Sequence, residues 1–441
     1  MNLGLCKIKK MTLKLKTTDN NFKDEFNDYV LRSIDPDHNV VSTVRNIIRK
    51  VKVDGDSAVN AYTNELDCNN LKSDEILLSQ NEASELIDNL EDSVKKAIDV
   101  AAKRVGSYHE KQIPKNLSYT DETGSILGYQ WKPIEKVGIY VPGGTASYPS
   151  TVLMNAIPAI VAGVKNIVMV TPAHEGKLNS ASIYAANLLG IKNIYRIGGA
   201  QAIAALAYGT ESIQRVDKIV GPGNAYVAEA KKQVFGSVGI DMFAGPSEVV
   251  VVADDLNNPK IIAADLISQA EHDKDAQSIL ITNDESLAIE VEKEMITQLK
   301  SLPRCDIATE SWGKHGLIIT TTSIDEAIDI VNMLAPEHLE LSIQDARSYV
   351  NKINHAGAIF VGSSTPEAIG DYIAGPSHVL PTARTARYSS GLSVFDFIKR
   401  TSIVECSPES FEVIGNDARI IAMNEGLDGH ARSIEYRLSK K

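Results

Sequence analysis

The sequence predicts an α/β protein with two consecutive parallel-sheet domains, a helical N-terminal segment and a helical C-terminal tail. Short β-rich runs alternate with helical segments from Val137 to Gly199, and the alternation restarts after Pro246. Such a β-α-β-α-β rhythm is typical of a parallel sheet whose crossover helices pack on its faces. With 441 residues, the chain is also long enough to form two separate cores.

The first α/β domain is expected within residues 36–245, after an N-terminal segment of residues 1–35. Apolar residues recur at helical spacing in residues 44–51, 58–64 and 83–105, which predicts helices there. Further along, we expect strands at 137–141, 166–170 and 193–197, with helices at 150–162 and 178–189 between them.

The second α/β domain is expected within residues 246–384, with strands at 249–253, 278–282 and 358–362 and helices at 259–271 and 324–334. Residues 385–441 form a tail with a different character, because helices are predicted at 417–424 and 430–438 outside both sheets. A helical tail of this kind often packs elsewhere, including on a neighbouring subunit.

Composition and charge limit the class of protein. Hydrophobic residues make up 43% and charged residues 23%, and 57 acidic residues exceed 45 basic ones, which gives a formal net charge of −12. Nucleic acid and anionic membrane surfaces would repel such a chain, so we expect neither as the main partner. No apolar run reaches the length of a membrane span, and the cysteines form no C-x-x-C pair: they are Cys6, Cys68, Cys305 and Cys406. We therefore expect a cytoplasmic protein without disulfides.

Three predicted strands of the first domain end in glycine-rich turns, at residues 142–144, 198–199 and 221–223. Open α/β sheets bind ligands at the carboxyl ends of their strands, and glycine lets a backbone approach a phosphate closely. The chain contains no G-x-G-x-x-G sequence, and each of these glycines is explained as well by a tight turn alone. The turns permit a nucleotide site without identifying one.

Gln269 and His272 lie three residues apart near the end of a predicted helix, so their side chains leave the same face. A neutral imidazole is the commonest metal ligand, and an amide oxygen can complete such a site. Taken alone, however, the segment is better explained as an exposed helix terminus, with His272 at the negative end of the helix dipole.

Glu337 and His338 follow Pro336, which ends a predicted helix just before a short β-run. An adjacent carboxylate and imidazole can supply two separate proton acceptors. A solvated helix terminus accounts for the same pair.

Two other segments carry possible ligands. Asp371 and His378 lie in a glycine-punctuated loop after a predicted strand, and loops on a rigid scaffold often carry binding residues. Glu425 and His430 flank a helix break in the tail, where each could instead be a cap or a solvated charge. None of these pairs alone identifies a metal site.

Taken together, these segments resemble the histidinol dehydrogenase family over almost the whole chain. The segments that carry the resemblance are residues 138–144 (GIYVPGG), 197–204 (IGGAQAIA), 221–226 (GPGNAY), 244–249 (AGPSEV), 269–272 (QAEH), 335–339 (APEHL), 370–372 (GDY), 378–382 (HVLPT) and 425–427 (EGL) with His430. So many motifs in one order argue against a chance match.

The resemblance implies a role for each matching residue. Four residues match zinc ligands that also contact the substrate: Gln269, His272, Asp371 and His430. Glu337 and His338 match the two proton acceptors. The other substrate contacts match Ser247, Glu425 and again His338, with His378 nearby, and the NAD contacts match Tyr140, Gln201 and Asn224.

The resemblance also implies an incomplete Rossmann-like NAD site, an aldehyde dehydrogenase-like architecture and one Zn²⁺ per subunit. The implied assembly is a homodimer in which the tail crosses over, so that Glu425 and His430 complete the partner's site. The implied reaction oxidises L-histidinol through L-histidinal to L-histidine with two NAD.

Other classes of protein fit the sequence less well. A thiol-dependent aldehyde dehydrogenase needs an activated cysteine, but Cys68 has acidic, polar neighbours that do not favour a thiolate, and the other three cysteines lie in no glycine-rich loop. A non-catalytic metal- or nucleotide-binding relative would be favoured by loss of Glu337, His338 or a ligand, and all of them are present. A zinc hydrolase would be expected to carry H-E-x-x-H, which is missing from the sequence.

Overall fold

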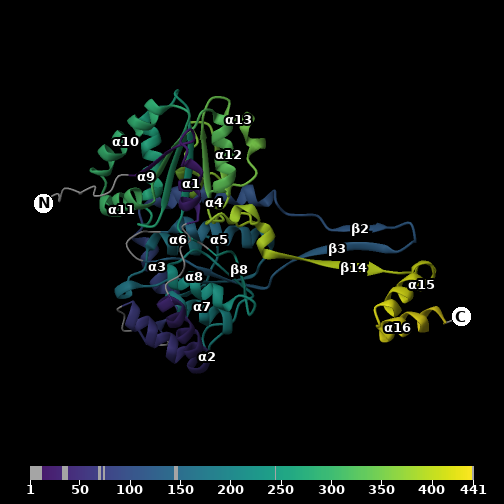
Figure 1. Cartoon of the computed structure of the whole chain (residues 1–441). Helices are drawn as coiled ribbons and strands as arrows, with labels where there is room; N and C mark the ends of the chain where they lie inside the picture. The colour runs from purple at the N-terminus through teal and green to yellow at the C-terminus, as the bar shows by residue number, and fades with distance from the viewer. Residues whose placement is uncertain are drawn as a thin grey trace.

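The computed structural model describes residues 12–31, 38–67, 71–72, 75–143, 148–243 and 245–439. Within these residues the chain forms two parallel sheets covered by helices and a third, antiparallel sheet that projects to one side (Figure 1). The α/β fold class with two parallel sheets is therefore confirmed.

The first sheet is parallel and has the strand order β6-β5-β4-β7-β8. Counted along the chain this is the order 3-2-1-4-5, so the winding reverses between β4 and β7. Open α/β sheets bind ligands at the carboxyl ends of the two strands where the winding reverses. The strands are β4 (Lys136–Tyr140), β5 (Asn166–Val170), β6 (Asn193–Tyr195), β7 (Lys218–Val220) and β8 (Gly239–Ile240).

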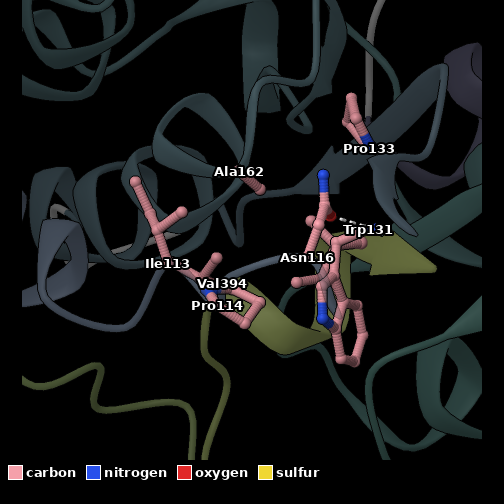
Figure 2. Close-up of a pocket in the computed structure, with 8 residues that line it drawn as sticks. Ile113, Pro114, Asn116, Trp131, Pro133, Ala162 and Val394 are labelled. Atoms are coloured by element: carbon pink, nitrogen blue, oxygen red, sulfur yellow. Dashed lines mark hydrogen bonds between the residues drawn. The ribbon is translucent and has the colours of Figure 1, made fainter. Parts of the chain in front are cut away.

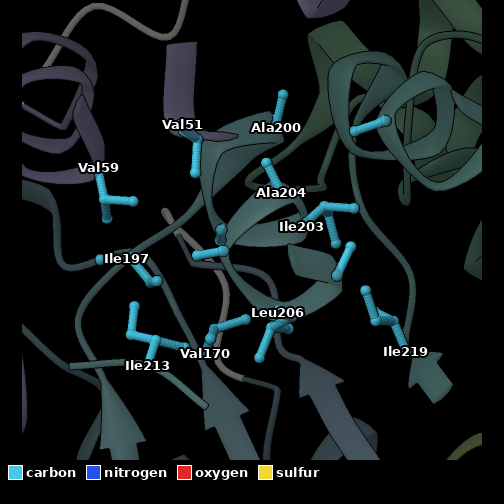
Figure 3. Close-up of a cluster of buried hydrophobic side chains, with 14 of the residues drawn as sticks. Val51, Val59, Val170, Ile197, Ala200, Ile203, Ala204, Leu206, Ile213 and Ile219 are labelled. Atoms are coloured by element: carbon cyan, nitrogen blue, oxygen red, sulfur yellow. The ribbon is translucent and has the colours of Figure 1, made fainter. Parts of the chain in front are cut away.

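Helices from both the crossovers and the N-terminal region cover this sheet. They are α2 (His38–Leu66), α3 (Gln80–Asp88), α4 (Asp92–Glu110), α5 (Pro149–Ala162), α6 (Ser180–Leu188), α7 (Gly199–Tyr208) and α8 (Ala225–Val234). Residues 200–207 of α7 are buried, and five of them are alanines, which lets α2 pack closely against this helix. Val51 and Val59 of α2 join Ile203 of α7 and Ile219 of β7 in one core cluster (Figure 3).

The second sheet is also parallel and has the order β1-β11-β10-β9-β12-β13. Without β1 it repeats the order 3-2-1-4-5, with the reversal between β9 and β12. Its strands are β1 (Leu13–Lys16), β9 (Glu248–Ala253), β10 (Gln277–Thr282), β11 (Leu317–Thr320), β12 (His338–Ser342) and β13 (Ala358–Val361). The helices around it are α1 (Phe22–Val30), α9 (Pro259–Ala270), α10 (Glu285–Leu299), α11 (Cys305–His315), α12 (Ile324–Leu334), α13 (Ala346–Tyr349) and α14 (Glu367–Tyr372).

The two parallel sheets and the helices around them form the body of the molecule. The antiparallel sheet leads away from this body and carries the C-terminal helices at its far end (Figure 1). We call it, together with these helices, the arm: β2 (Leu117–Thr120), β3 (Ile126–Pro133), β14 (Ile398–Glu405), α15 (Pro408–Asn424) and α16 (Asp428–Leu438). Most side chains of β2 and β14 are exposed. In this chain the arm sheet therefore has no buried face.

A cavity of about 200 Å³ lies where the arm joins the body (Figure 2). It is lined by Ile113, Pro114, Asn116, Trp131, Pro133, Ala162, Val394 and Ile398. No residue with a predicted role in catalysis or binding lines this cavity.

The structure differs from the sequence-based expectation in three places. The N-terminal segment, expected to be helical, contributes β1 to the second sheet before α1 begins. The helix expected at residues 83–105 is two helices, α3 and α4, and the tail begins with β14 before its helices. The short strand β1 and the solvated arm strands lack the long apolar pattern from which strands are predicted. The division into domains at residues 35, 245 and 384 remains a prediction.

No helix among the described residues is both long and apolar enough to cross a membrane.

Candidate functional site

The two predicted proton acceptors lie where β12 begins, next to β9 at the reversal point of the second sheet. His338 is the first residue of β12, and Glu337 directly precedes it. Helix α12 ends because Ala335 adopts a left-handed conformation (φ 49°) and Pro336 follows. The chain therefore turns straight from α12 into the strand and buries both side chains.

Backbone groups of Glu248, the first residue of β9, hold both acceptors. Its N–H donates to Oε2 of Glu337 at 2.9 Å, and its carbonyl oxygen lies 3.0 Å from Nδ1 of His338. Because a carbonyl can only accept, Nδ1 carries the imidazole proton. The unprotonated Nε2 is then free to accept a proton, and it lies 3.9 Å from Oδ1 of Asp371.

Helix α14 brings two carboxyl groups to the same histidine. Glu367 and Asp371 are four residues apart and so share one face of the helix. Oε1 of Glu367 lies 3.5 Å from Nδ1 of His338, and candidate ligand atoms of His338, Glu367 and Asp371 all lie within 4.8 Å of one another. His378 joins them, with Nδ1 2.9 Å from the backbone oxygen of Asp371.

The end of α9 supplies the remaining ligand candidates of the body. Nε2 of His272 lies 3.9 Å from Oδ2 of Asp371. Gln269, in the last turn of α9, is fully buried, and neither atom of its side-chain amide has a hydrogen-bond partner among the described residues. A buried amide without a partner is costly, which makes Gln269 a good candidate for a ligand contact.

Burial sets the protonation of this cluster. It raises the pKa of the Glu337 carboxyl well above its usual range, and the nearby Glu248 and Asp371 add to the rise. Burial also lowers the pKa of His338 to about 3 and that of His378 to about 4, so both imidazoles are neutral near pH 7. Burial and neighbouring carboxylates raise the pKa of Glu367 as well. This crowding of acidic groups beside neutral imidazoles and a free amide suits a divalent cation with nitrogen and oxygen ligands.

Sequence reasoning missed Glu367 and gave Glu248 no role. The four-residue spacing between Glu367 and Asp371 was the available signal, but it becomes informative only if residues 367–372 form a helix. Nothing local in the sequence shows that the backbone of Glu248 contacts Glu337 and His338, because those residues are about ninety positions away.

The predicted NAD contacts lie around the carboxyl end of the first sheet. Tyr140 is the last residue of β4, and its hydroxyl accepts the N–H of Gly199 at 3.1 Å. Gln201 is buried on α7, and its Oε1 has no partner among the described residues. Asn224 is exposed and caps α8, since Oδ1 accepts the N–H groups of Tyr226 and Val227. Its carboxamide therefore already has a structural role.

The remaining predicted residues do not all reach the cluster. Ser247 is half-buried directly before β9, and its carbonyl accepts the N–H of Gln277. Glu425 and His430 are exposed on the arm, which extends away from the body that holds Asp371 (Figure 1). A single chain therefore brings together His272, Glu337, His338, Asp371 and His378 and leaves out the two residues from the tail.

A family model, curated relatives and a solved structure all match this chain to histidinol dehydrogenases. A family model described as histidinol dehydrogenase matches residues 31–438. The histidinol dehydrogenase of Mesorhizobium japonicum is 51% identical over 97% of this chain and 100% of its own length, and that of Rhizobium meliloti is 50% identical over 97% and 99%. A solved structure of histidinol dehydrogenase from Elizabethkingia anophelis matches with a TM-score of 0.92 at 38% identity, over 97% of this chain and 98% of that one. The chain is therefore an enzyme of the histidinol dehydrogenase family.

Proposed function

We propose that this chain oxidises L-histidinol through L-histidinal to L-histidine in histidine biosynthesis, with zinc and two NAD. The observation that carries the proposal is the cluster at the start of β12, where a neutral histidine and a buried carboxyl group lie beside His272 and Asp371. Membership of the histidinol dehydrogenase family supports the choice of substrate.

Three residues of the body would hold the zinc ion: Gln269, His272 and Asp371. Two observations support this ligand set: the amide of Gln269 has no hydrogen-bond partner among the residues that the structure describes, and Nε2 of His272 lies 3.9 Å from Oδ2 of Asp371. Bound zinc would supply a template for the imidazole and amine nitrogens of histidinol, with Lewis acidity as a secondary contribution. Ser247 and His378 would contact the substrate from the body.

His338 would accept the proton in both hydride transfers. As a hydride leaves the carbinol carbon for NAD, Nε2 of His338 takes the hydroxyl proton, and histidinal results. Glu337 then takes a proton from the water that adds to the aldehyde, and the protonated His338 returns its proton to the carbonyl oxygen, which gives the diol and leaves Nε2 free again. His338 accepts a proton from the resulting diol as the second hydride leaves, which gives the acid. The bond from Glu248 N–H to Oε2 of Glu337 fixes the carboxyl group, and burial strengthens its affinity for a proton.

NAD would bind at the carboxyl ends of β4 and β7, with contacts to Tyr140, Gln201 and Asn224. The reversal of the winding between these strands supports this location, as does Oε1 of Gln201, which has no hydrogen-bond partner in the part of the chain that the structure describes.

A homodimer would complete the site. Glu425 and His430 are exposed on the arm, and α15 exposes Val413, Ile420, Ile421 and Met423. Exposed apolar side chains on an extended arm favour a symmetric exchange in which each arm packs on the other subunit. His430 of the partner subunit would then be the fourth zinc ligand, and Glu425 of the partner subunit would contact the substrate.

Counting NADH tests the whole proposal. We expect two NADH for each L-histidinol consumed and one zinc per subunit by metal analysis. Chelation should remove both the zinc and the activity, and added zinc should restore them. A zinc-loaded protein that forms no NADH from histidinol would refute the proposed function.

The Glu337→Gln variant is expected to slow the oxidation of histidinal about a hundredfold. Glutamine keeps the shape of the side chain but cannot take a proton from the attacking water. Oxidation of histidinol to histidinal should be little affected, so one NADH forms quickly and aldehyde accumulates in a rapid-mixing experiment. The role of Glu337 would be wrong if the variant slowed the alcohol step and oxidised added histidinal normally.

A further inference from the structure

A fully buried ion pair lies behind the glycine turn that follows β7. Lys231, on α8, contacts the carboxylate of Asp241, just after β8, and both side chains are at least 96% buried. Buried ion pairs contribute little net stability, because removing two charges from water offsets most of their attraction. Stability alone therefore does not explain this pair, and its other hydrogen bonds indicate a second role.

Both side chains also hold the peptide groups of Gly221. Oδ2 of Asp241 accepts the N–H of Gly221 at 2.7 Å, and Nζ of Lys231 donates to its carbonyl oxygen at 3.0 Å. Side chains on a helix tilt toward its N-terminus, which lets Lys231 reach back to the turn that precedes α8. Both the N–H and the carbonyl oxygen of Gly221 are therefore hydrogen-bonded to buried side chains.

Gly221 needs these two hydrogen bonds because its backbone has an unusual conformation and lies very close to the backbone of β4. Its φ is +111°, and a Cβ there would collide with the backbone carbonyl oxygen of Tyr140. The turn therefore packs directly on the end of β4, at the point where the winding of the sheet reverses. Asn224, three residues later, is the N-cap of α8.

The pair is neutral overall, so it adds little charge to the site. An isolated lysine near this turn would attract the pyrophosphate of a dinucleotide electrostatically. Here the ammonium group contacts Asp241 and a backbone oxygen instead. Its effect on a bound ligand must then come from the geometry of the turn.

We propose that Lys231 and Asp241 are positioning residues for NAD: they hold the Gly221 turn against Tyr140 in the shape that accepts the cofactor. This inference rests on the proposed function, in which NAD binds at the ends of β4 and β7. Neither residue touches the reacting atoms.

The Lys231→Met and Asp241→Asn variants test this role. We expect each to raise the KM and the dissociation constant for NAD about tenfold, since methionine removes the charged donor to the carbonyl oxygen of Gly221 and asparagine leaves only a neutral acceptor for its N–H. The KM for histidinol and the zinc content should stay unchanged. Each single variant leaves one buried charge unpaired and should unfold at a lower temperature than the wild type. The double variant leaves no unpaired buried charge, so it should be more stable to heat than either single variant. It should still show the raised KM for NAD, because the donor to the carbonyl oxygen of Gly221 is missing.

A matched control lies at the opposite end of the same strand. Lys218, the first residue of β7, donates to Oδ1 and to the backbone oxygen of Asp396 at 3.0 and 2.9 Å. Lys218→Met also removes a partly buried ion pair but leaves the turn alone, so the affinity for NAD should be unchanged. An equal loss of affinity in this variant, or none in the folded Lys231 and Asp241 variants, would overturn the inference.

Two further measurements separate the possible failures. If the single variants do not fold, hydrogen exchange on the wild-type enzyme still tests whether Asp241 holds the Gly221 turn, because the amide of Gly221 should then exchange slowly. Fast exchange at that amide would contradict the inference. If the wild-type protein itself fails to bind NAD, the proposed function fails as well, whereas normal binding by the wild type limits the failure to the role of the pair.

Discussion

Replacing His338 with asparagine is expected to lower kcat about a thousandfold for both oxidation steps. The side-chain amide of asparagine can still donate to the carbonyl oxygen of Glu248, as Nδ1 does now. It has no counterpart of the free Nε2, so neither the alcohol nor the diol can give up its proton. Because the site keeps its shape, the KM for histidinol should change little. Steady-state rates with histidinol and with histidinal as separate substrates measure the effect.

The control for this variant is His315→Asn. His315 also lies beside a carboxylate, with Nε2 3.4 Å from Asp275, but it ends α11 and takes no part in the cluster around Asp371. Its replacement should leave both rates near the wild-type value. A His338→Asn enzyme that retained one of the two rates would show that this histidine serves only the other step.

The sequence predicts the central strands of the two parallel sheets well because these strands are buried on both faces. Continuous apolar runs such as residues 249–253 and 278–282 have strong strand signals, and the structure has strands at Glu248–Ala253 and Gln277–Thr282. The arm strands have no such signal, since their side chains remain in solvent. A strand that buries neither face in its own chain cannot be read from hydrophobic periodicity.

The site is predictable only in part for a similar reason. Local spacing places Gln269 with His272 and Glu337 with His338, but contacts between distant segments decide the chemistry. The tautomer of His338 depends on the carbonyl of Glu248, and Glu367 reaches the imidazole only because α14 packs beside β12. Only the motif resemblance indicates Asp371 and His378. Asp371 lies on α14, which is too short to give a periodic signal and replaces the loop expected there, and His378 lies in the loop that follows.

Exchange of arms between subunits should allow two inactive variants to restore each other's activity in a mixed dimer. The His338→Asn and His430→Asn enzymes should each be nearly inactive. The first has its defect in the body, at the start of β12, and the second has its defect in α16 of the arm. In a mixed dimer, an intact body would receive the intact tail of its partner at one of the two sites. Mixed dimers isolated with two different affinity tags should therefore regain about half of the wild-type activity.

A second pairing shows whether the recovery comes from shared sites. Mixed dimers of His338→Asn with Gln269→Ala carry one defect in each body, so no site is complete and the activity should stay low. Arms that stayed with their own chain would leave both pairings inactive, because every site would then keep the defect of its own subunit. Recovery in the first pairing alone would thus place His430 in the site of the neighbouring subunit, which explains why α16 lies at the far end of the arm (Figure 1).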